Sequence, residues 1–342
     1  MRKKIFIGLI NTAGICTRFK KGFKSIGYKI DFYSFDKHIY NYGYDKIINF
    51  SENYFLRKIQ IIIFLVKLIF SYQYFIYVSM VSILKDFNEI KILKYFNKKF
   101  ALIVTGCDVR LPEIVNKYKW NPCRDCTDEY KKFTNCIIDI KIKKIRHVEK
   151  LFDYIYSPIE CAGYFEKEYY NIFFPLNISD FPEKTINDLK INSKIRILHA
   201  PTNLEYKGSK YIYKVIDELN KSYDFDFNIV TGVSIGDLYQ EILKSDIIID
   251  QMLVGIYGLF AIESMAMYKP VISYVRDDTW NFIKDDCPII NSNPDNIFFN
   301  LENLLKHPAL LPELGIKSRK YIEKYHDSEK IAEKIINNFA NK

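Results

Sequence analysis

A lysine and a glycine follow an apolar run at the start of the second half of the chain. The run 195–200 contains His199, and Lys207 and Gly208 come where a helix is expected to begin. An ammonium group beside the free backbone N–H groups of a helix start attracts a phosphate. We therefore predict that Lys207 and Gly208 contact a phosphate; the alternative is a lysine solvated on the first helical turn. His199 is either a buried structural residue or a ligand contact.

A second group of residues has the spacing of a strand, a loop and a helix. The strand 246–250 ends on Asp250, the loop contains Gly255 and Gly258, and the helix begins near Gly258. Glycines let a ligand approach the backbone, and a helix N-terminus favours a phosphate. Glu263 follows in an apolar stretch, where a buried carboxylate needs a partner. Two ribose hydroxyls would supply donors; a buried salt bridge is the alternative.

In the first half of the chain, polar residues also follow strands. Gly14 lies in the loop after the first apolar run, and Gly106 and Asp108 follow the fourth. In a parallel sheet such positions lie at the carboxyl ends of the strands, where ligands bind. Asp108 is predicted to orient the hydroxyls of a substrate or to pair with Arg110, and an ordinary tight turn is the alternative for Gly14.

Short apolar runs alternate with helical patterns along the whole chain, which indicates an α/β protein with parallel sheets. Helices are expected at 17–26, 53–70 and 82–97 in the first half. The expected strands of the two halves are 4–10, 29–34, 74–79, 101–105 and 154–157, followed by 195–200, 226–230, 246–250, 270–274 and 288–290.

The length and the composition predict two domains. At about 150 residues per domain, 342 residues make two, and the polar, proline-containing stretch 175–193 suits a linker. We place an N-terminal Rossmann-like domain at 1–180, with a cysteine-containing excursion at about 106–150. A C-terminal domain follows at 190–325, and a last helix, 326–342, is expected to cross back to the N-terminal domain.

The second half of the chain resembles the donor-binding half of retaining, family 4-type glycosyltransferases of the GT-B fold. The resemblance is carried in register by Gly258-Leu259, Glu263, Met265-Ala266 and Pro270-Val271, and it covers about 195–335. It implies two Rossmann-like domains with parallel sheets facing each other across a cleft. It also implies retaining transfer of a hexosyl or related sugar from a nucleotide-sugar to a glycan or lipid-linked acceptor of cell-envelope polysaccharide.

Several site residues follow from this resemblance. Asp108 and Lys207 are assigned to catalysis, and the leaving diphosphate is expected to be stabilised by Lys207 and the helix start, without a catalytic metal or a cofactor. The residues assigned to donor binding are Gly14, Asn203, Lys207, Gly208, Gln251, Tyr257, Gly258, Leu259 and Glu263.

The sequence departs from the family pattern at three places. Gly255 stands where the family has a glutamate that holds the sugar, and Asp250 or Gln251 is the suggested replacement. The arginine that usually accompanies the lysine is missing, and Arg276 is the suggested substitute. Thr105 stands where related sequences often have a histidine. The nucleotide site therefore follows from the pattern, while the base, the sugar and the acceptor stay open.

Four of the seven cysteines fall in the excursion. Cys123 and Cys126 form a C-x-x-C half-site, which Cys107 and Cys136 would complete as a structural zinc site; free thiols are the alternative. Asp224 and Asp226 resemble a metal-binding D-x-D pair but lack its flanking residues.

The net charge of +9 suits anionic partners. No nucleic-acid motif is present, so the alternatives to a transferase are an epimerase-like GT-B enzyme and a non-catalytic basic binding module. The apolar start 5–10 is too short for a signal peptide, and we expect a cytoplasmic protein, in peripheral contact with the anionic inner face of the membrane. The apolar stretch 53–70 is interpreted as an amphipathic or buried helix, with a surface-lying helix as the alternative.

Overall fold

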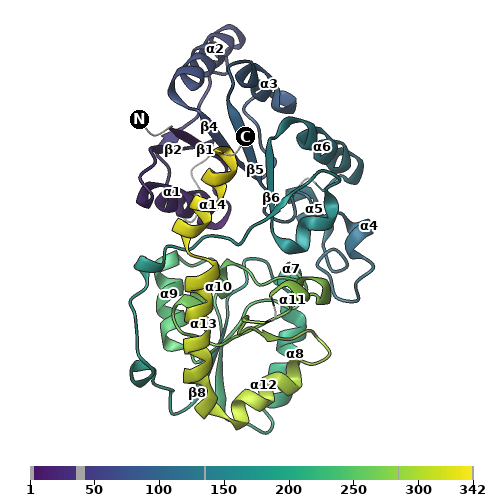
Figure 1. Cartoon of the computed structure of the whole chain (residues 1–342). Helices are drawn as coiled ribbons and strands as arrows, with labels where there is room; N and C mark the ends of the chain where they lie inside the picture. Colours follow the sequence, from purple (N-terminus) through teal and green to yellow (C-terminus); the bar gives the residue numbers. More distant parts are fainter. Residues whose placement is uncertain (1–3, 36–42, 135, 284, 341–342) are drawn as a thin grey trace. The chain divides into compact units, whose positions relative to one another are not determined.

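The computed structural model describes residues 4–35, 43–134, 136–283 and 285–340. The chain divides into two compact units (Figure 1). Unit 1 contains the chain through Leu111, Cys136–Asn177 and the residues from Ser328 on, and unit 2 contains residues 112–135 and Ile178–Asp327.

Unit 1 is built on a parallel sheet of seven strands in the order β3-β2-β1-β4-β5-β6-β7. Every residue of β1 and β4 is buried, as expected for strands covered by helices on both faces. Two strands, β3 and β7, were not predicted, because each is a two-residue edge strand without an apolar run. The bounds are β1 Ile5–Leu9, β2 Ile30–Ser34, β3 Lys46–Ile47, β4 Tyr74–Val78, β5 Lys99–Ile103, β6 Tyr154–Ser157 and β7 Tyr170–Asn171.

The helices of unit 1 include the last helix of the chain. They are α1 Ile15–Ser25, α2 Tyr54–Ser71, α3 Asn88–Tyr95, α6 Ile138–Leu151 and α14 Ser328–Ala340. Helix α14 packs on α1, where a Cβ on Gly22 would lie 2.3 Å from the Ser328 carbonyl oxygen. The ring of Phe339 stacks on Tyr74 of β4, with 4.6 Å between ring centroids. The C-terminal residues are therefore part of the core of unit 1.

Helix α2 begins at an asparagine cap and leaves much of its apolar surface exposed. The Asn53 side chain accepts hydrogen bonds from the N–H groups of Phe55 and Leu56. Only Leu65 and Leu68 of α2 are buried, so the interpretation of 53–70 as a buried helix is wrong. An amphipathic helix would turn a polar face to solvent, whereas α2 exposes apolar side chains there. Among the described residues, no helix has the length and apolar content that crossing a bilayer requires.

Unit 2 has a parallel sheet of five strands in the order β12-β11-β10-β8-β9. Its core lies between this sheet and helices α8 and α12, around Ile197, Ile249 and Leu301. The strands are β8 Ile195–His199, β9 Phe225–Ile229, β10 Ile247–Ile249, β11 Val271–Ser273 and β12 Ile290–Asn291. The helices are α7 Leu204–Lys207, α8 Ser209–Leu219, α9 Ile235–Lys244, α10 Leu259–Ala266, α11 Asp277–Ile283, α12 Ile297–Lys306 and α13 Leu311–Tyr325.

The middle of the predicted excursion belongs to unit 2, which differs from the domain boundaries expected from sequence. Residues 112–135 carry α4 (Pro112–Val115) and α5 (Asp128–Phe133). They are held on unit 2 by side-chain bonds: Lys119 pairs with Asp295 at 2.7 Å, and Asp125 accepts from the Tyr211 hydroxyl at 3.1 Å. Sequence order alone could not reveal these pairings across more than 80 residues.

Candidate functional site

The candidate donor site lies in unit 2 at the carboxyl ends of β8 and β10. Strand β8 pairs with β9 on one side and with β10 on the other, so the strand order reverses at β8. In open parallel sheets, ligands bind outside the carboxyl ends of the strands at such a reversal. The α7–α8 turn follows β8, and Asp250 directly follows β10. Both sequence signals therefore meet at one edge of one sheet.

Lys207, Asp250 and Gly258 form a bonded group at this edge. The Lys207 ammonium contacts Asp250 Oδ1 at 2.8 Å, and the Gly258 N–H donates to Asp250 Oδ2 at 2.6 Å. The Asp250 side chain is 0% exposed and the Lys207 side chain 13%. An ammonium has three donors, and Asp250 uses one of them. Lys207 thus neutralises a buried carboxylate, a role that the sequence analysis did not foresee, and it reaches the surface at the predicted phosphate position.

Two glycines leave space around this group. A Cβ on Gly258 would lie 3.0 Å from Lys207 Nζ and 3.3 Å from Asp250 Oδ2. Gly208 has φ +73°, and a Cβ there would lie 2.9 Å from Leu253 Cγ. Gly208 therefore needs glycine for its backbone conformation, and Gly258 needs it for the lysine–aspartate contact.

Glu263 lies on α10, which begins directly after Gly258, and is 3% exposed. Its Oε1 accepts a hydrogen bond from the Tyr239 hydroxyl of α9 at 3.1 Å. Tyr239 is a neighbour that no sequence motif indicated. A carboxylate has about four lone-pair sites, so a buried carboxylate at this position is the type of group that the predicted contact with ribose hydroxyls requires.

Three residues predicted to bind the donor make hydrogen bonds within unit 2. The Gln251 amide group donates to the Ile256 and Tyr274 carbonyls, and its oxygen accepts from the Leu253 and Val254 N–H groups. Gln251 thus holds the loop after β10 against the end of β11, with its amide group bonded to both. Leu259, also assigned to donor binding, is the first residue of α10.

Asn203 and Tyr257, the other two of these three residues, fix neighbouring elements. The Asn203 side chain caps α7 by accepting from the Tyr206 N–H at 2.6 Å. The Tyr257 hydroxyl lies 2.9 Å from the Tyr321 hydroxyl and 3.0 Å from His326 Nε2. Tyr257 is buried, and burial raises its pKa well above the ordinary value. Tyr257 therefore ties the loop to α13 as a neutral phenol.

His199 is a structural residue in the described fold. Its Nδ1 lies 2.8 Å from the Ile249 carbonyl oxygen, and its Nε2 lies 2.8 Å from the Ser209 hydroxyl. A carbonyl only accepts, so Nδ1 carries the proton and Nε2 accepts from Ser209. Burial lowers the pKa of His199 to about 4. Of the two alternatives that the sequence left open, the structure supports the buried structural histidine.

Arg276 lies beside the same loop. The backbone N–H of Arg276 donates to the Gly255 carbonyl at 3.0 Å. The guanidinium group donates to the Asp278 carboxylate at 2.5 and 2.9 Å. The Tyr118 ring lies over the guanidinium, 4.2 Å away, and the Tyr118 hydroxyl bonds to Asp278. The substitute for the family's arginine is thus a positioned cation whose charge Asp278 partly balances.

In unit 1, hydroxyls and Gly14 gather at the carboxyl edge of the sheet. Gly14 follows β1 with φ +78° and caps α1. The Ser79 hydroxyl, after β4, lies 2.8 Å from the Thr105 hydroxyl and 3.4 Å from that of Thr12. Strand order also reverses here, since β1 pairs with both β2 and β4. Gly14, which was assigned to donor binding, therefore shares one edge of unit 1 with three hydroxyl side chains, of which Thr12 and Ser79 were not predicted.

Asp108 closes the loop at this edge. Both of its carboxylate oxygens accept from the Thr105 N–H at 3.1 Å, and burial raises its pKa. Arg110, the alternative partner of Asp108, forms its ion pair with Glu160 at 2.5 Å, and both side chains are buried. The charge of Arg110 also acts on Asp108 and lowers the pKa of that carboxyl, against the larger effect of burial. Glu160 lies 50 residues from Arg110 and could be found only from the fold.

The four cysteines of the zinc interpretation are divided between the units. Cys107 and Cys136 lie in unit 1, whereas Cys123 and Cys126 lie in unit 2. Arg110 donates to Cys107 Sγ and Lys141 donates to Cys136 Sγ, both at 3.3 Å. Within the described parts of the chain, no three His, Cys, Asp or Glu side chains form a group that could hold a metal ion.

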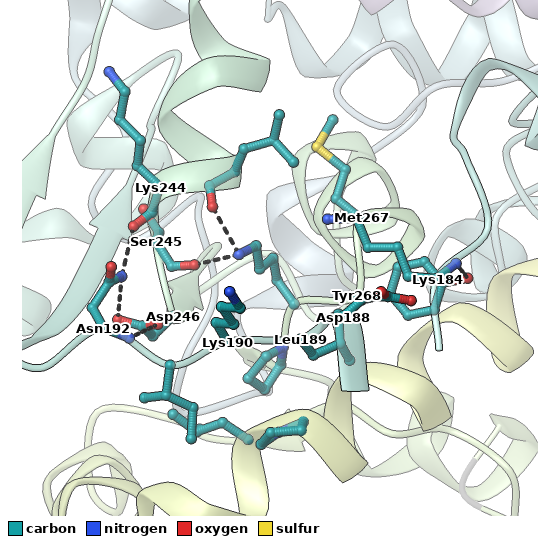
Figure 2. Close-up of a pocket in the computed structure, with 16 residues that line it drawn as sticks. Lys184, Asp188, Leu189, Lys190, Asn192, Lys244, Ser245, Asp246, Met267 and Tyr268 are labelled. Carbon is teal, nitrogen blue, oxygen red and sulfur yellow. Dashed lines mark hydrogen bonds between the residues drawn. The ribbon is translucent and has the colours of Figure 1, made fainter. Parts of the chain in front are cut away.

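Each unit also has a cavity. In unit 1, a cavity of about 610 Å³ adjoins α3 and α6 and is lined by Lys91, Lys143, Lys144 and His147. In unit 2, a cavity has a volume of about 290 Å³, and Asn192, Asp246 and Tyr268 are among the residues that line it (Figure 2). Asp246 precedes β10, so this second cavity lies at the amino ends of the strands, the opposite edge from Lys207. It is not the candidate donor site.

Comparison with solved structures identifies the fold. No family model and no curated protein matches the chain. HepE of Anabaena, solved with UDP-glucose, has 9% identity and a TM-score of 0.66, with 100% of both chains covered. A glycosyltransferase of Rickettsia africae has 14% identity and a TM-score of 0.63, covering 98% of this chain and 97% of that one.

Sucrose-phosphate synthase of Thermosynechococcus elongatus is also similar, with 13% identity, a TM-score of 0.60 and 99% of both chains covered. The chain therefore has the α/β fold of GT-B glycosyltransferases, as the sequence predicted. The resemblance to one family within that fold stays a prediction.

Proposed function

We propose that this protein is a retaining glycosyltransferase that takes a hexosyl or related sugar from a nucleotide-sugar. The observation that carries the proposal is the position of Lys207, Asp250 and Gly258 at the strand-order reversal of unit 2. A partly exposed ammonium at that edge suits the diphosphate of a nucleotide-sugar. HepE of Anabaena, which shares the fold, was solved with UDP-glucose and with UDP.

The proposed chemistry breaks the bond between the sugar C1 and the diphosphate oxygen and forms a bond from C1 to the oxygen of an acceptor hydroxyl on the same face, while the hydroxyl proton passes to the leaving diphosphate. Negative charge develops on the leaving diphosphate. Lys207 and Arg276 are fixed cations beside the loop after β10, so they would stabilise that charge without reorganising. Glu263 would hold the ribose hydroxyls. The proposal assigns no step to a metal.

For the acceptor, we propose a glycan or lipid-linked glycan of cell-envelope polysaccharide. The support is the cavity of unit 1, whose lining includes Lys91, Lys143 and Lys144. Three ammonium groups against one carboxylate, that of Asp86, favour an anionic acceptor, such as one that carries a phosphate. Asp108, with its raised pKa, would orient an acceptor hydroxyl. We further propose that the enzyme works at the inner face of an anionic membrane.

The direct test is incubation with a panel of nucleotide-sugars, with and without a polyprenyl-phosphate-linked glycan acceptor, while release of nucleoside diphosphate is measured. A transferase releases it quickly only when the acceptor is present. Isomerised sugar without acceptor would identify an epimerase, and no reaction under any condition would favour a binding module. Either of these two results would overturn the proposal.

The ribose contact has its own test. Glu263→Gln should weaken binding of the correct nucleotide by about 1.5–3 kcal/mol, the contribution of a hydrogen bond to a charged group. The 2′-deoxy nucleotide should bind wild type weakly and lose little more in the variant, because both changes remove one interaction. Additive losses would show that Glu263 does not hold the ribose. Tyr239→Phe is the matched control, because it removes the Tyr239 hydroxyl contact of the carboxylate and leaves Glu263 in place.

EDTA tests the proposed absence of a catalytic metal. If protein cations stabilise the leaving group, initial rates should be the same with and without the chelator. Loss of activity that only Mg²⁺ or Mn²⁺ restores would instead show a metal-assisted mechanism. Slow loss accompanied by unfolding would point to structural zinc, which measured zinc content would identify.

A further inference from the structure

Helix α2 exposes large apolar side chains that the fold does not use. Phe55 is 75% exposed and Phe70 is 85% exposed. Phe55, Ile59, Ile62, Val66 and Phe70 are spaced by three or four residues, so they form one stripe along the helix. Leu56 and Ile63 are exposed beside it.

The opposite side of α2 attaches the helix to unit 1. Leu65 and Leu68 are buried, and the Phe64 ring contacts the rings of Tyr33 and Phe50, with centroids 5.6 and 5.9 Å apart. The apolar stripe therefore faces away from the core while the helix is held in place. A stripe of this length on one helix exceeds the scattered exposure that is normal for a protein surface.

The neighbouring helix also exposes large apolar side chains. Helix α3 lies beside α2 (Figure 1), and Ile92, Tyr95 and Phe96 at its exposed side are 41%, 85% and 45% exposed. We call the combined surface the α2–α3 face. It comprises Phe55, Leu56, Ile59, Ile62, Ile63, Val66, Phe70, Ile92, Tyr95 and Phe96.

The charges of the two helices have one sign. Helix α2 contains basic residues and no acidic one, and α3 adds Lys91 and Lys94. The one acidic residue of the two helices, Glu89, is buried and accepts from the Ile83 and Leu84 N–H groups. The basic residues of α2 are Arg57, Lys58 and Lys67.

We propose that the α2–α3 face docks on an anionic lipid bilayer. The apolar stripe would enter the boundary between headgroups and acyl chains, and Lys58 and Lys67, which flank the stripe at helical spacing, would meet the lipid phosphates. A second copy of the chain fits this face less well, because its cations would approach those of the first. Lys91 of α3 also lines the large cavity of unit 1, so the same helix contributes to the α2–α3 face and to that cavity. The proposal is independent of the transfer chemistry.

Flotation with lipid vesicles tests the proposal on the whole protein. Wild type should float with vesicles that contain 30% phosphatidylglycerol, at least about tenfold more than with pure phosphatidylcholine, because each cation near an anionic surface adds attraction. The double variant Phe55→Ser/Phe70→Ser should reduce the partition coefficient about tenfold or more, because two exposed phenyl groups no longer enter the bilayer.

The matched control is Phe282→Ser/Phe299→Ser, which removes two phenyl groups of unit 2 that are 72% and 67% exposed. These two variants should have unchanged thermal unfolding, since all four side chains are exposed. If the control lowers flotation as much as the α2 variant does, general hydrophobicity explains the binding and the proposal is wrong.

The charges are tested separately. Lys58→Glu/Lys67→Glu should lower binding to the anionic vesicles about tenfold, whereas Lys214→Glu/Lys221→Glu, at exposed positions of unit 2, should change it less than twofold. Equal losses would mean that only the net charge matters.

A tryptophan locates the contact. Phe70→Trp should show a blue-shifted emission with anionic vesicles and quenching by brominated lipid. An unshifted emission while the protein floats would place the contact elsewhere and overturn the proposal. Light scattering without lipid tests self-association: a dimer that Phe55→Ser/Phe70→Ser dissociates would assign the face to a second copy instead.

Discussion

Lys207 has two roles that the sequence pattern could not separate. Its ammonium was predicted as a phosphate contact, and the structure also makes it the partner of Asp250, whose side chain is 0% exposed. Removing one member of a buried ion pair leaves the other charge uncompensated, which destabilises more than the pair itself stabilises. The lysine therefore matters to the stability of unit 2 and, in the proposed function, to donor binding.

Lys207→Ala should weaken donor binding or turnover by about 2–4 kcal/mol, the range expected for a charge-assisted contact to the phosphates. It should also lower the free energy of unfolding by about 3 kcal/mol, because Asp250 loses its cation. Isothermal titration with nucleotide and urea denaturation measure the two effects.

A double variant separates the effect of Lys207 on stability from its effect on donor binding. Lys207→Ala/Asp250→Asn removes the uncompensated charge, and the amide oxygen can still accept from the Gly258 N–H. Stability should recover by about 2 kcal/mol while nucleotide affinity stays low. Recovery of both would show that Lys207 acts only by holding Asp250.

His199 makes a specific pH dependence expected. Its pKa is lowered to about 4 by burial, against about 6.5 in the unfolded chain. The unfolded state therefore binds a proton that the folded state does not, and stability falls as the pH decreases from 6.5 toward 4. The slope should be about 1.4 kcal/mol per pH unit, about 2 kcal/mol between pH 6.5 and 5.

Urea denaturation of wild type and His199→Gln between pH 7.5 and 5 measures this loss. The wild type should lose stability over that range, and the variant, which cannot be protonated there, should have a flatter profile. Parallel profiles would mean that another group causes the pH dependence.

At the scale of elements, the loop between β10 and α10 brings the site together. It turns so that the N–H of Gly258 meets the carboxylate at the end of β10, and Gln251 holds its interior. The 112–135 segment adds Tyr118 over Arg276 from the other side. The β10–α10 loop and the 112–135 segment thus bring together the side chains of the candidate site, which the strands alone would not do.

Gly258→Ala tests how closely this loop fits. The new Cβ would lie 3.0 Å from Lys207 Nζ, so the end of the lysine must move. We expect at least a tenfold loss of nucleotide affinity, about 1.4 kcal/mol, with a change in unfolding free energy below about 1 kcal/mol. Nucleotide titration and urea denaturation check both values.

Gly236→Ala is the control, because its Cβ would lie no closer than 3.8 Å to the Ser234 hydroxyl. It should leave affinity unchanged. Unchanged affinity in Gly258→Ala as well would show that the lysine position is not critical.

At the scale of the whole molecule, the two units are interleaved along the chain. Residues 112–135 leave the first half to join unit 2, and the chain from Ser328 on returns to unit 1. Both tryptophans, Trp120 and Trp280, lie in unit 2. Tryptophan fluorescence therefore reports on unit 2, whereas far-ultraviolet circular dichroism reports on both units.

Phe339→Ala should destabilise unit 1 selectively. The side chain is 2% exposed and stacks on Tyr74, so its removal should cost about 3 kcal/mol. We expect the dichroism to show an earlier partial transition on heating, while the fluorescence transition keeps its midpoint. Phe299→Ala, an exposed phenylalanine, is the control, and coincident shifts of both signals would show that the units unfold together.

The sequence by itself determined the kind of fold and the edges of the sheets where a site would lie. Apolar runs such as those of β1 and β4 reflect parallel strands buried on both faces, and this information is local. For the same reason, Lys207, Gly208 and Gly258 could be placed at strand ends and helix starts. Local patterns also explain why the two-residue edge strands β3 and β7 were missed.

Only the tertiary structure decided which partners these residues have. Glu160 for Arg110, Tyr239 for Glu263 and Asp250 for Lys207 are separated by 50, 24 and 43 residues. The sequence also left open whether the apolar side chains of α2 are buried or exposed, because an apolar stripe on a helix has the same spacing in both cases. Pairing and burial depend on which distant segments of the chain come into contact in the folded protein, and local periodicity does not contain that information.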